Sequence, residues 1–205
     1  MTDSAVGESL AEVTGLGLVR GGRVLFESLS FAIRAGELWQ LEGGNGAGKT
    51  SLLRILAGLS RYGFDGLVSR AEAPLYVGHQ AAVKGLLSAR ENLLWHVSGG
   101  CAFADEQIEQ ALQRVGLCGF EDTPSHALSA GQQRRVNLAR LFLSDTRLWL
   151  LDEPFTAIDA VGVSELQDRI GTHVAHGGAV VVTSHQPLQV DHAVHHLSLD
   201  GARIS

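Results

Sequence analysis

The chain has 205 residues, of which 45% are hydrophobic and 19% are charged, and its formal net charge is −6 at pH 7. This composition is typical of a globular domain that is long enough to bury a full core. The acidic balance argues against a broad nucleic-acid surface, which needs basic residues, so we expect no nucleic-acid partner.

Residues 1–10 are polar and acidic, unlike a secretory signal, and we expect them to be a disordered N-terminus. No run approaches the ~18 apolar residues of a membrane span. The two cysteines, Cys101 and Cys118, are too few for a disulfide framework and are expected to be reduced. Any membrane association is therefore expected to come through a partner protein.

Residues 11–205 are expected to form a single α/β domain with a mostly parallel sheet. Alternating and fully apolar runs predict strands at 13–19, 28–33, 37–41, 75–78, 147–151 and 179–183. Helical periodicity predicts helices at 51–57, 88–97, 105–115, 131–143 and 161–174. The stretch at about 84–143 is therefore predicted to be a helical insertion, after a small β-rich entry.

A glycine-rich loop follows the strand predicted at 37–41 and fits the pattern G-x-x-x-x-G-K-[ST]. Its residues are Gly43, Gly44, Asn45, Gly46, Ala47, Gly48, Lys49 and Thr50. A strand, a glycine loop and a helix in this order aim backbone N–H groups and a helix N-terminus at one anion. All eight positions and both flanks fit, which disfavours the alternative of a chance turn before a helix. The loop is predicted to bind a nucleoside triphosphate, with Ser51 among its contacts, Lys49 on the β- and γ-phosphates and Thr50 on Mg²⁺.

A second motif is the apolar strand predicted at 147–151, which ends in Asp152 and Glu153. Phosphate-loop enzymes hold Mg²⁺ with an Asp at the end of such a buried strand. Asp152 is therefore a predicted metal ligand, and the adjacent Glu153 is a candidate general base for the attacking water. The alternative is that the two residues are merely a solvated acidic pair. The phosphate loop disfavours this alternative, because the two motifs occur together in phosphate-loop enzymes.

Residues 128–135 open a predicted helix, with Ser129 as its N-cap. Together with the two motifs on either side, this segment makes the chain resemble the ATP-binding subunits of ABC transporters, from about residue 13 onward. In that family the segment reads L-S-G-G-Q, and Ala130 replaces one glycine here. The resemblance implies a P-loop NTPase core of the ABC ATPase type, with an N-terminal β-subdomain and an inserted helical subdomain.

The resemblance also implies roles for single residues. It assigns Gln80 as a sensor near Mg²⁺ and the attacking water, and His185 as the histidine that contacts the γ-phosphate. Asp159 matches the aspartate that follows the Asp-Glu strand in the family. Arg20 stands where relatives stack adenine on an aromatic side chain, and a guanidinium plane can also stack on a base.

The implied mechanism needs two copies of the chain, with ATP and Mg²⁺ as ligands. In the family, a helix N-terminus faces the γ-phosphate held by the other subunit, and here it would comprise Ser129, Ala130, Gly131 and Gln132. ATP would favour the closed homodimer and hydrolysis would release it, because the two states differ in affinity.

Several stretches are most similar to the branch of the family that serves c-type cytochrome biogenesis. They are residues 41–50, 59–61, 76–80, 91–93 and 128–135, and the pair His79-Gln80 is the most distinctive. The likeness implies an ATPase coupled to transport that acts in haem export or in release of haem from its chaperone. Its partners would be integral membrane subunits of a cytochrome c maturation complex, and it would lie peripherally on the cytoplasmic face of the bacterial inner membrane.

Other interpretations stay open from the sequence. The same ATPase could serve an exporter of lipid, lipoprotein or drug. A soluble ABC ATPase is expected to have tandem domains, a coiled-coil insertion or basic surfaces. A non-catalytic adaptor would not need Lys49, Asp152, Glu153 and His185.

Apolar residues after Gln80 form either a docking groove for a partner helix or the core of the helical part: Val83, Leu86, Leu87, Leu93, Leu94 and Trp95. The histidines at 192, 195 and 196 match no strong ligand spacing and are expected to be solvated.

Overall fold

The computed structural model describes residues 7–94, 103–156, 158–184, 186–200 and 203–204. The chain divides into two compact units. The first contains Met1–Tyr76, Thr146–Asp152 and Ile170–Ser205, and the second contains Val77–Asp145 and Glu153–Arg169. The insertion predicted at about 84–143 falls within the second unit, and its standing as a separate subdomain stays a prediction.

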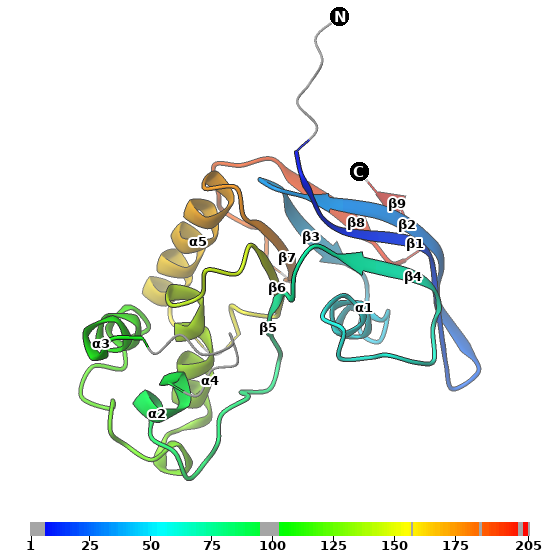
Figure 1. Ribbon diagram of the computed structural model, residues 1–205. Helices are drawn as coiled ribbons and strands as arrows, with labels where there is room; N and C mark the ends of the chain where they lie inside the picture. The colour runs from blue at the N-terminus through cyan, green and yellow to red at the C-terminus, as the bar shows by residue number, and fades with distance from the viewer. Residues whose placement is uncertain (1–6, 95–102, 157, 185, 201–202, 205) are drawn as a thin grey trace, which may run out of the picture. The chain divides into compact units, whose positions relative to one another are not determined.

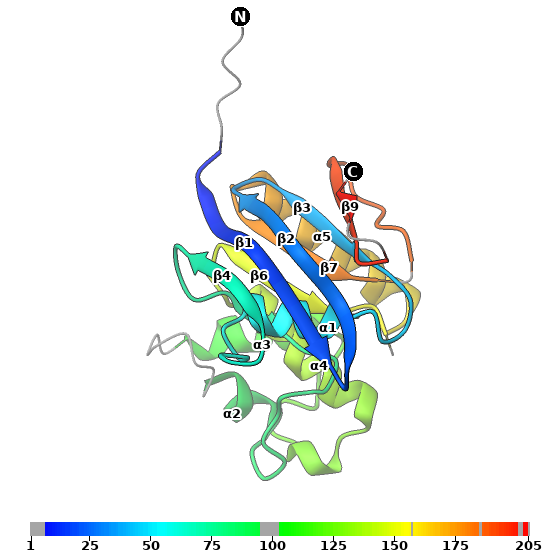
Figure 2. The ribbon, with the colours of Figure 1, turned by 90° about the vertical axis from the view of Figure 1, so that its right-hand side faces the viewer.

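An antiparallel sheet of the first unit is built from β1 (Ser9–Arg20), β2 (Arg23–Arg34) and β4 (Asp65–Arg70), in the order β2-β1-β4 (Figure 2). A two-residue turn at Gly21 and Gly22 joins β1 to β2. Both glycines have positive φ, 56° and 74°, the geometry that lets a short turn follow the twist of a hairpin. The hairpin extends both strands beyond the predicted 13–19 and 28–33, and β1 takes in residues 9 and 10 of the segment expected to be disordered.

The second sheet is mostly parallel, as predicted, and carries the site. It contains β3 (Leu38–Glu42), β5 (Leu75–Val77), β6 (Leu148–Asp152), β7 (Ala179–Thr183), β8 (Val194–Ser198) and β9 (Arg203–Ile204), in the order β5-β6-β7-β3-β8-β9 (Figure 1). β3 is parallel to β7 and β8, and β7 is parallel to β6. Thr183 pairs with both Leu41 and Asp152, so the carboxyl ends of β3, β7 and β6 meet at one edge.

Helix α1 (Lys49–Leu56) begins directly after the glycine-rich loop and packs against β6 and β7. Its apolar face is buried and consists of Leu52, Leu53, Ile55 and Leu56. These four side chains belong to one hydrophobic core with residues of both sheets, among them Leu16, Ile33 and Leu150. Burying a Leu or Ile side chain contributes about 1.5–3 kcal/mol, so this core fixes the start of α1 at the sheet edge.

The second unit is mainly helical. Its elements are α2 (Ala89–Leu94), α3 (Asp105–Arg114), the 3-10 turn η1 (Ser125–Ala127), α4 (Ala130–Ala139), the 3-10 turn η2 (Arg140–Phe142) and the first part of α5 (Ala160–Ala175). A core of its own includes Leu93, Ile108 and Val136. The helix predicted at 131–143 is thus an α-helix that tightens into a 3-10 turn. The end of the helix predicted at 88–97 lies outside the described residues.

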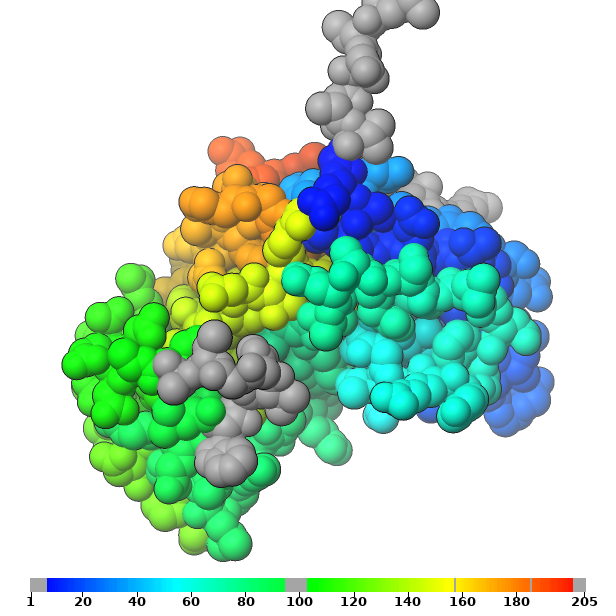
Figure 3. Space-filling model, in the orientation of Figure 1, coloured from blue at the N-terminus to red at the C-terminus, as the bar shows by residue number. Residues whose placement is uncertain are grey.

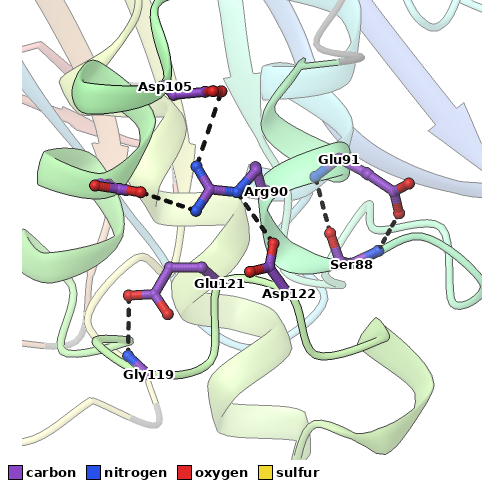
Figure 4. Close-up of polar contacts among 8 residues, drawn as sticks. Ser88, Arg90, Glu91, Asp105, Gly119, Glu121 and Asp122 are labelled. Atoms are coloured by element: carbon purple, nitrogen blue, oxygen red, sulfur yellow. Dashed lines mark hydrogen bonds and ion pairs between the residues drawn. The ribbon is translucent and has the colours of Figure 1, made fainter.

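An ion-pair cluster centred on Arg90 ties α2 to α3 and to the loop before η1 (Figure 4). The guanidinium lies 3.0 Å from Glu109, 3.1 Å from Asp122 and 3.9 Å from Asp105. Hydrogen bonds to Glu109 and Asp122 raise the pKa of Arg90. Ser88 and Glu91 cap α2 reciprocally, at 2.7 and 3.1 Å between backbone nitrogen and side-chain oxygen.

Apolar side chains also lie at the surface of the first unit. The segment from the end of α1 through β4, cyan to teal in Figure 3, is exposed and contains Leu59, Tyr62 and Leu67. None of the helices formed by the described residues is both long and apolar enough to cross a membrane.

Candidate functional site

The glycine-rich loop lies between β3 and α1, where the sequence predicts it. Gly48 is the N-cap of α1, has φ 107° and supplies no side-chain acceptor to the first N–H groups of the helix. A Cβ on Gly48 would lie 3.1 Å from Cε1 of Phe26 and 3.3 Å from Cβ of Leu25. The loop therefore needs glycine here both for its backbone and for space. It presents a helix N-terminus that suits an anion such as a phosphate.

Lys49 holds its ammonium group over this loop. Its Nζ donates to the carbonyl oxygen of Gly43 at 2.5 Å and to that of Gly44 at 3.2 Å. The N–H of Gly44 donates in turn to Oδ2 of Asp200 at 2.9 Å. Asp200 was not predicted, because it lies 156 residues away in sequence and no motif contains it.

Thr50 and Asp152 are brought together, as a shared metal site requires. Oδ1 of Asp152 accepts from Oγ1 of Thr50 at 3.2 Å and from Oγ1 of Thr183 at 3.0 Å. Asp152 is 1% exposed, and Thr183 is fully buried. A hydroxyl and a carboxylate are hard oxygen ligands, and Mg²⁺ uses few protein ligands because it keeps waters and substrate phosphates. The donor set thus fits Mg²⁺. Only the pairing of β6 with β7 places Thr183 here, so sequence reasoning missed it.

Tyr76 on β5 is affected by the same carboxylate. Burial and, secondarily, the negative charge of Asp152 raise the pKa of Tyr76 from 10.0 to about 12, while Arg54 lowers it slightly. The phenol therefore stays protonated through the neutral range.

Arg20 lies at the end of β1, where the resemblance puts the base of the nucleotide. It lines a cavity of about 250 Å³ with residues that include Ser51 and Tyr62. Ser51 is the residue after Thr50 in the first turn of α1. The structure therefore brings two predicted nucleotide contacts to one cavity and adds an aromatic side chain to it.

The second unit holds the other predicted site residues. Ser129 is the N-cap of α4, as predicted. Its Oγ accepts from the N–H of Gln132 at 3.2 Å, and Oε1 of Gln132 accepts from the N–H of Ser129 at 2.8 Å. This reciprocal pair fixes the first turn, with Ala130 and Gly131 between the two residues. Asp159 caps α5 in a similar way, since its Oδ1 accepts from the N–H of Gly162 at 2.8 Å.

Glu153 has an unusual backbone. Its φ is 52°, in the left-handed region, and among the described residues other than glycine only Ser28 shares a positive φ. Its carbonyl accepts from the N–H of Thr156 at 3.2 Å and from Nη2 of the buried Arg134. Nη1 of Arg134 donates to the carbonyl of His79, the residue before Gln80. Gln80 itself is exposed and outside any helix or strand. Arg134 lies within the 128–135 segment that carries the resemblance, but sequence reasoning assigned it no role, because nothing in the segment tells which carbonyls its guanidinium contacts.

The remaining predictions have mixed outcomes. His185 and Trp95 lie outside the described residues. His195 stacks on Trp39 with ring centroids 4.8 Å apart, and Nδ1 of His196 lies 2.7 Å from Oε1 of Glu42. These two histidines are therefore partly buried and partnered, which differs from the solvated state expected. No group of three or more His, Cys, Asp or Glu residues arranged for a metal occurs in the described part of the chain.

Of the six apolar residues after Gln80, Leu93 is fully buried in the core of the second unit and Val83 packs against it. Leu86 is 88% exposed and Leu94 is 39% exposed. Leu93 and Val83 therefore belong to the core of the second unit, as one interpretation has it. Leu86 and Leu94 are exposed, and the docking of a partner helix on this stretch stays a prediction.

Comparison with known proteins gives matches over most of the chain. The model of the family described as ABC transporter matches residues 26–156. The cytochrome c biogenesis ATP-binding export protein CcmA of Pseudomonas putida is 48% identical over 189 residues, which cover 87% of this chain and 90% of that protein. The protein of the same name from Idiomarina loihiensis is 49% identical over 185 residues, 84% of each chain. A solved ATP-binding subunit of an ABC transporter superposes with a TM-score of 0.80 at 20% identity, covering 93% of this chain and 85% of that one.

Proposed function

This chain belongs to the ABC transporter family, and we propose that it is the ATP-hydrolysing subunit of a membrane exporter complex for c-type cytochrome biogenesis. Its task there would be haem export or release of haem from its chaperone. The proposal is supported by relatives 48% and 49% identical that are named as ATP-binding export proteins of cytochrome c biogenesis. The observation that carries the ATPase part is the meeting of the phosphate loop, Thr50 and Asp152 at one sheet edge.

Binding of ATP follows from the geometry of the loop. The N-terminus of α1 and the loop N–H groups attract the phosphates, and Lys49 moves its ammonium from the carbonyls of Gly43 and Gly44 onto the β- and γ-phosphates. Arg20 and Ser51 hold the base and the adjoining part of the nucleotide in the cavity that they share.

Thr50 and Asp152, with Gln80, are the residues that would hold Mg²⁺. When bound, the ion neutralises charge on the β- and γ-phosphates as the bond to the γ-phosphate breaks. Thr183 keeps Oδ1 of Asp152 in place through a buried hydrogen bond of 3.0 Å. The carboxylate is thereby oriented before a ligand arrives, which lowers the entropic cost of binding.

Hydrolysis requires an activated water in line with the γ-phosphate. Glu153 accepts the proton of that water as the general base, and His185 contacts the γ-phosphate. Two copies of the chain enclose each ATP, with the capped N-terminus of α4 at Ser129 facing the γ-phosphate bound by the other copy and Asp159 near the contact. The capping box fixes the backbone of the first turn of α4, which favours this role because the turn needs no rearrangement before it meets an anion.

The partners are integral membrane subunits, and the chain lies peripherally on the cytoplasmic face of the bacterial inner membrane. Export needs a path through the membrane, and the described part of the chain contains no helix that could provide one. The exposed side chains of Leu86 and Leu94 offer apolar surface for a cytoplasmic helix of such a partner.

The test of this function uses Glu153→Gln, which removes the base and keeps the shape of the side chain. We expect ATP binding near that of the wild type, hydrolysis reduced by about 10²–10⁴-fold, and accumulation of an ATP-bound dimer. Hydrolysis is measured by phosphate release and the dimer by sedimentation. Near-normal turnover of this variant would remove Glu153 from the role of base.

The same variant identifies the complex. Tagged Glu153→Gln is purified with ATP from detergent-solubilised membranes, and the recovered proteins and haem are analysed by mass spectrometry and absorbance. We expect small integral membrane proteins of cytochrome c maturation together with haem. An unrelated permease without haem would keep the ATPase mechanism and reject the cytochrome c role, and no membrane partner would reject the exporter.

A further inference from the structure

Arg134 is a buried cation in the second unit, and its hydrogen-bond partners indicate a role. It lies on α4, five residues after the N-cap Ser129, and is only 5% exposed. Arginine is almost never fully buried unless its donors are used, because removing the charge from water is costly. Its neighbour Arg135 is half-buried and donates from Nη1 to the carbonyl of Gly116 at 3.2 Å. The two arginines therefore serve different parts of the second unit.

The guanidinium of Arg134 joins two segments that carry candidate catalytic residues. Nη1 donates to the carbonyl of His79, with that of Gly78 at 3.4 Å, and Nη2 donates to the carbonyl of Glu153. Gln80 follows His79 directly. The guanidinium of arginine is planar, so the directions of its N–H donors are fixed relative to one another. The carbonyls of His79 and Glu153 are therefore held at fixed positions relative to each other.

The backbone of Glu153 gives this contact its importance. A residue other than glycine with φ 52° is held in a sparsely populated, strained conformation. Such a conformation persists only where neighbouring groups stabilise it. The bonds from Arg134 and from the N–H of Thr156 to the carbonyl of Glu153 stabilise this one, and they thereby set the direction in which the side chain leaves the backbone.

We propose that Arg134 is a positioning residue for hydrolysis. It orients Glu153 towards the attacking water and holds the segment of Gln80 in register with it. Arg134 and Ser129 lie on the same helix, α4. Arg134 therefore also connects the N-terminus of α4, which faces the ATP bound by the second copy, to the general base Glu153. This inference rests on the proposed function, since it takes Glu153 to be the base.

The main test compares Arg134→Lys and Arg134→Gln with the wild type, using the full-length chain in the assembly with which it co-purifies. We expect kcat to fall by roughly 10–100-fold, because small misplacement of a catalytic group is enough for such a loss. KM and equilibrium binding of a fluorescent ATP analogue should stay near wild type, since Lys49 and Thr50 are untouched. Arg135→Lys on the same helix is the matched control and should change kcat by no more than about twofold.

A double variant separates positioning from general stability. If Arg134 acts mainly through Glu153, adding Arg134→Lys to Glu153→Gln lowers the residual single-turnover rate much less than it lowers the rate when Glu153 is present, and any remaining loss comes from the segment of Gln80. If Arg134 only supports the fold, the loss recurs in that background, together with weaker nucleotide binding and a lower melting temperature. That outcome, or a wild-type kcat for Arg134→Lys, would overturn the inference.

The failure of this inference and of the proposed function can be told apart. Normal turnover of Glu153→Gln alone refutes the base assignment, whatever Arg134 does. A strong defect in Glu153→Gln with no defect in Arg134→Lys refutes only the positioning role. Should Arg134→Gln unfold, Arg134→Lys decides, because lysine keeps the buried charge and can still donate to one carbonyl.

Discussion

Tyr76 offers a test at the scale of one residue, because burial and Asp152 raise its pKa to about 12. A raised pKa in the folded state means that the folded chain binds the proton more tightly than the unfolded chain. The resulting stability is fully present below pH 10 and is lost as the pH rises to about 12. We expect Tyr76→Phe to flatten the fall of the unfolding free energy in this window, measured by urea titration at several pH values.

The control for this experiment is Tyr62→Phe, which removes the only other phenol of the chain from a side chain that is 91% exposed. It should leave the alkaline fall in stability unchanged. An equal effect of both variants, or none from Tyr76→Phe, would contradict the assigned burial of Tyr76.

The site residues fall into two groups, those that a sequence motif identifies and those that only the tertiary structure reveals. Lys49, Thr50 and Asp152 stand in motifs whose spacing carries their chemistry, and the structure places Thr50 beside Asp152. Thr183 and Arg134 act through hydrogen bonds to residues far away in sequence, and threonine or arginine alone indicates no role. No sequence pattern records which backbone carbonyl a buried guanidinium will meet.

At the scale of the element, α3 and α4 differ in their N-caps. Ser129 caps α4 with its hydroxyl, whereas Ala104 at the start of α3 has no acceptor and contributes only its N–H, bound to Oε1 of Gln107 at 3.0 Å. Ala104→Ser would complete the capping box with Gln107. We expect it to stabilise the chain by about 0.5–1 kcal/mol, measured by chemical unfolding.

Ala104→Val provides the matched control, because it adds atoms at the same position without an acceptor. It should not stabilise the chain. A gain of the same size from both substitutions would show that packing rather than capping at residue 104 is responsible.

Several strands could not be predicted from local pattern. β4 reads Asp-Gly-Leu-Val-Ser-Arg with most of its side chains exposed, and β8 contains two histidines. Neither shows the apolar alternation that predicts a strand. They form because β1 and β3 offer unpaired edges, against which β4 and β8 satisfy their backbone hydrogen bonds. By contrast, β6 and β7 are buried at every position and were predicted from their apolar runs alone.

At the scale of the whole molecule, the proposed attachment to a membrane partner can be tested at Leu86. This side chain is 88% exposed, so Leu86→Glu should not destabilise the fold. We expect less of the variant to be recovered in the membrane fraction, because a charge in an apolar contact is costly to desolvate. Recovery is measured by quantitative immunoblotting of membrane and supernatant fractions.

The control is Leu67→Glu on β4, which introduces the same charge at a side chain that is 74% exposed in the first unit. It should leave recruitment unchanged. Intact recruitment of Leu86→Glu would remove this residue from the docking surface, and an equal loss in both variants would point to general charge repulsion from the membrane.

The sequence by itself determined the family, the phosphate loop, the Asp-Glu strand end and the helix that Ser129 opens. It did so because each depends on residues that are neighbours in the chain or that recur at a set spacing. Only the tertiary structure decided the strand order, the bond of Thr183 to Asp152, the bond of Asp200 to the loop, and the bridge from Arg134 to Glu153. These contacts join distant parts of the chain, and which groups meet is settled by the packing of sheets and helices as a whole.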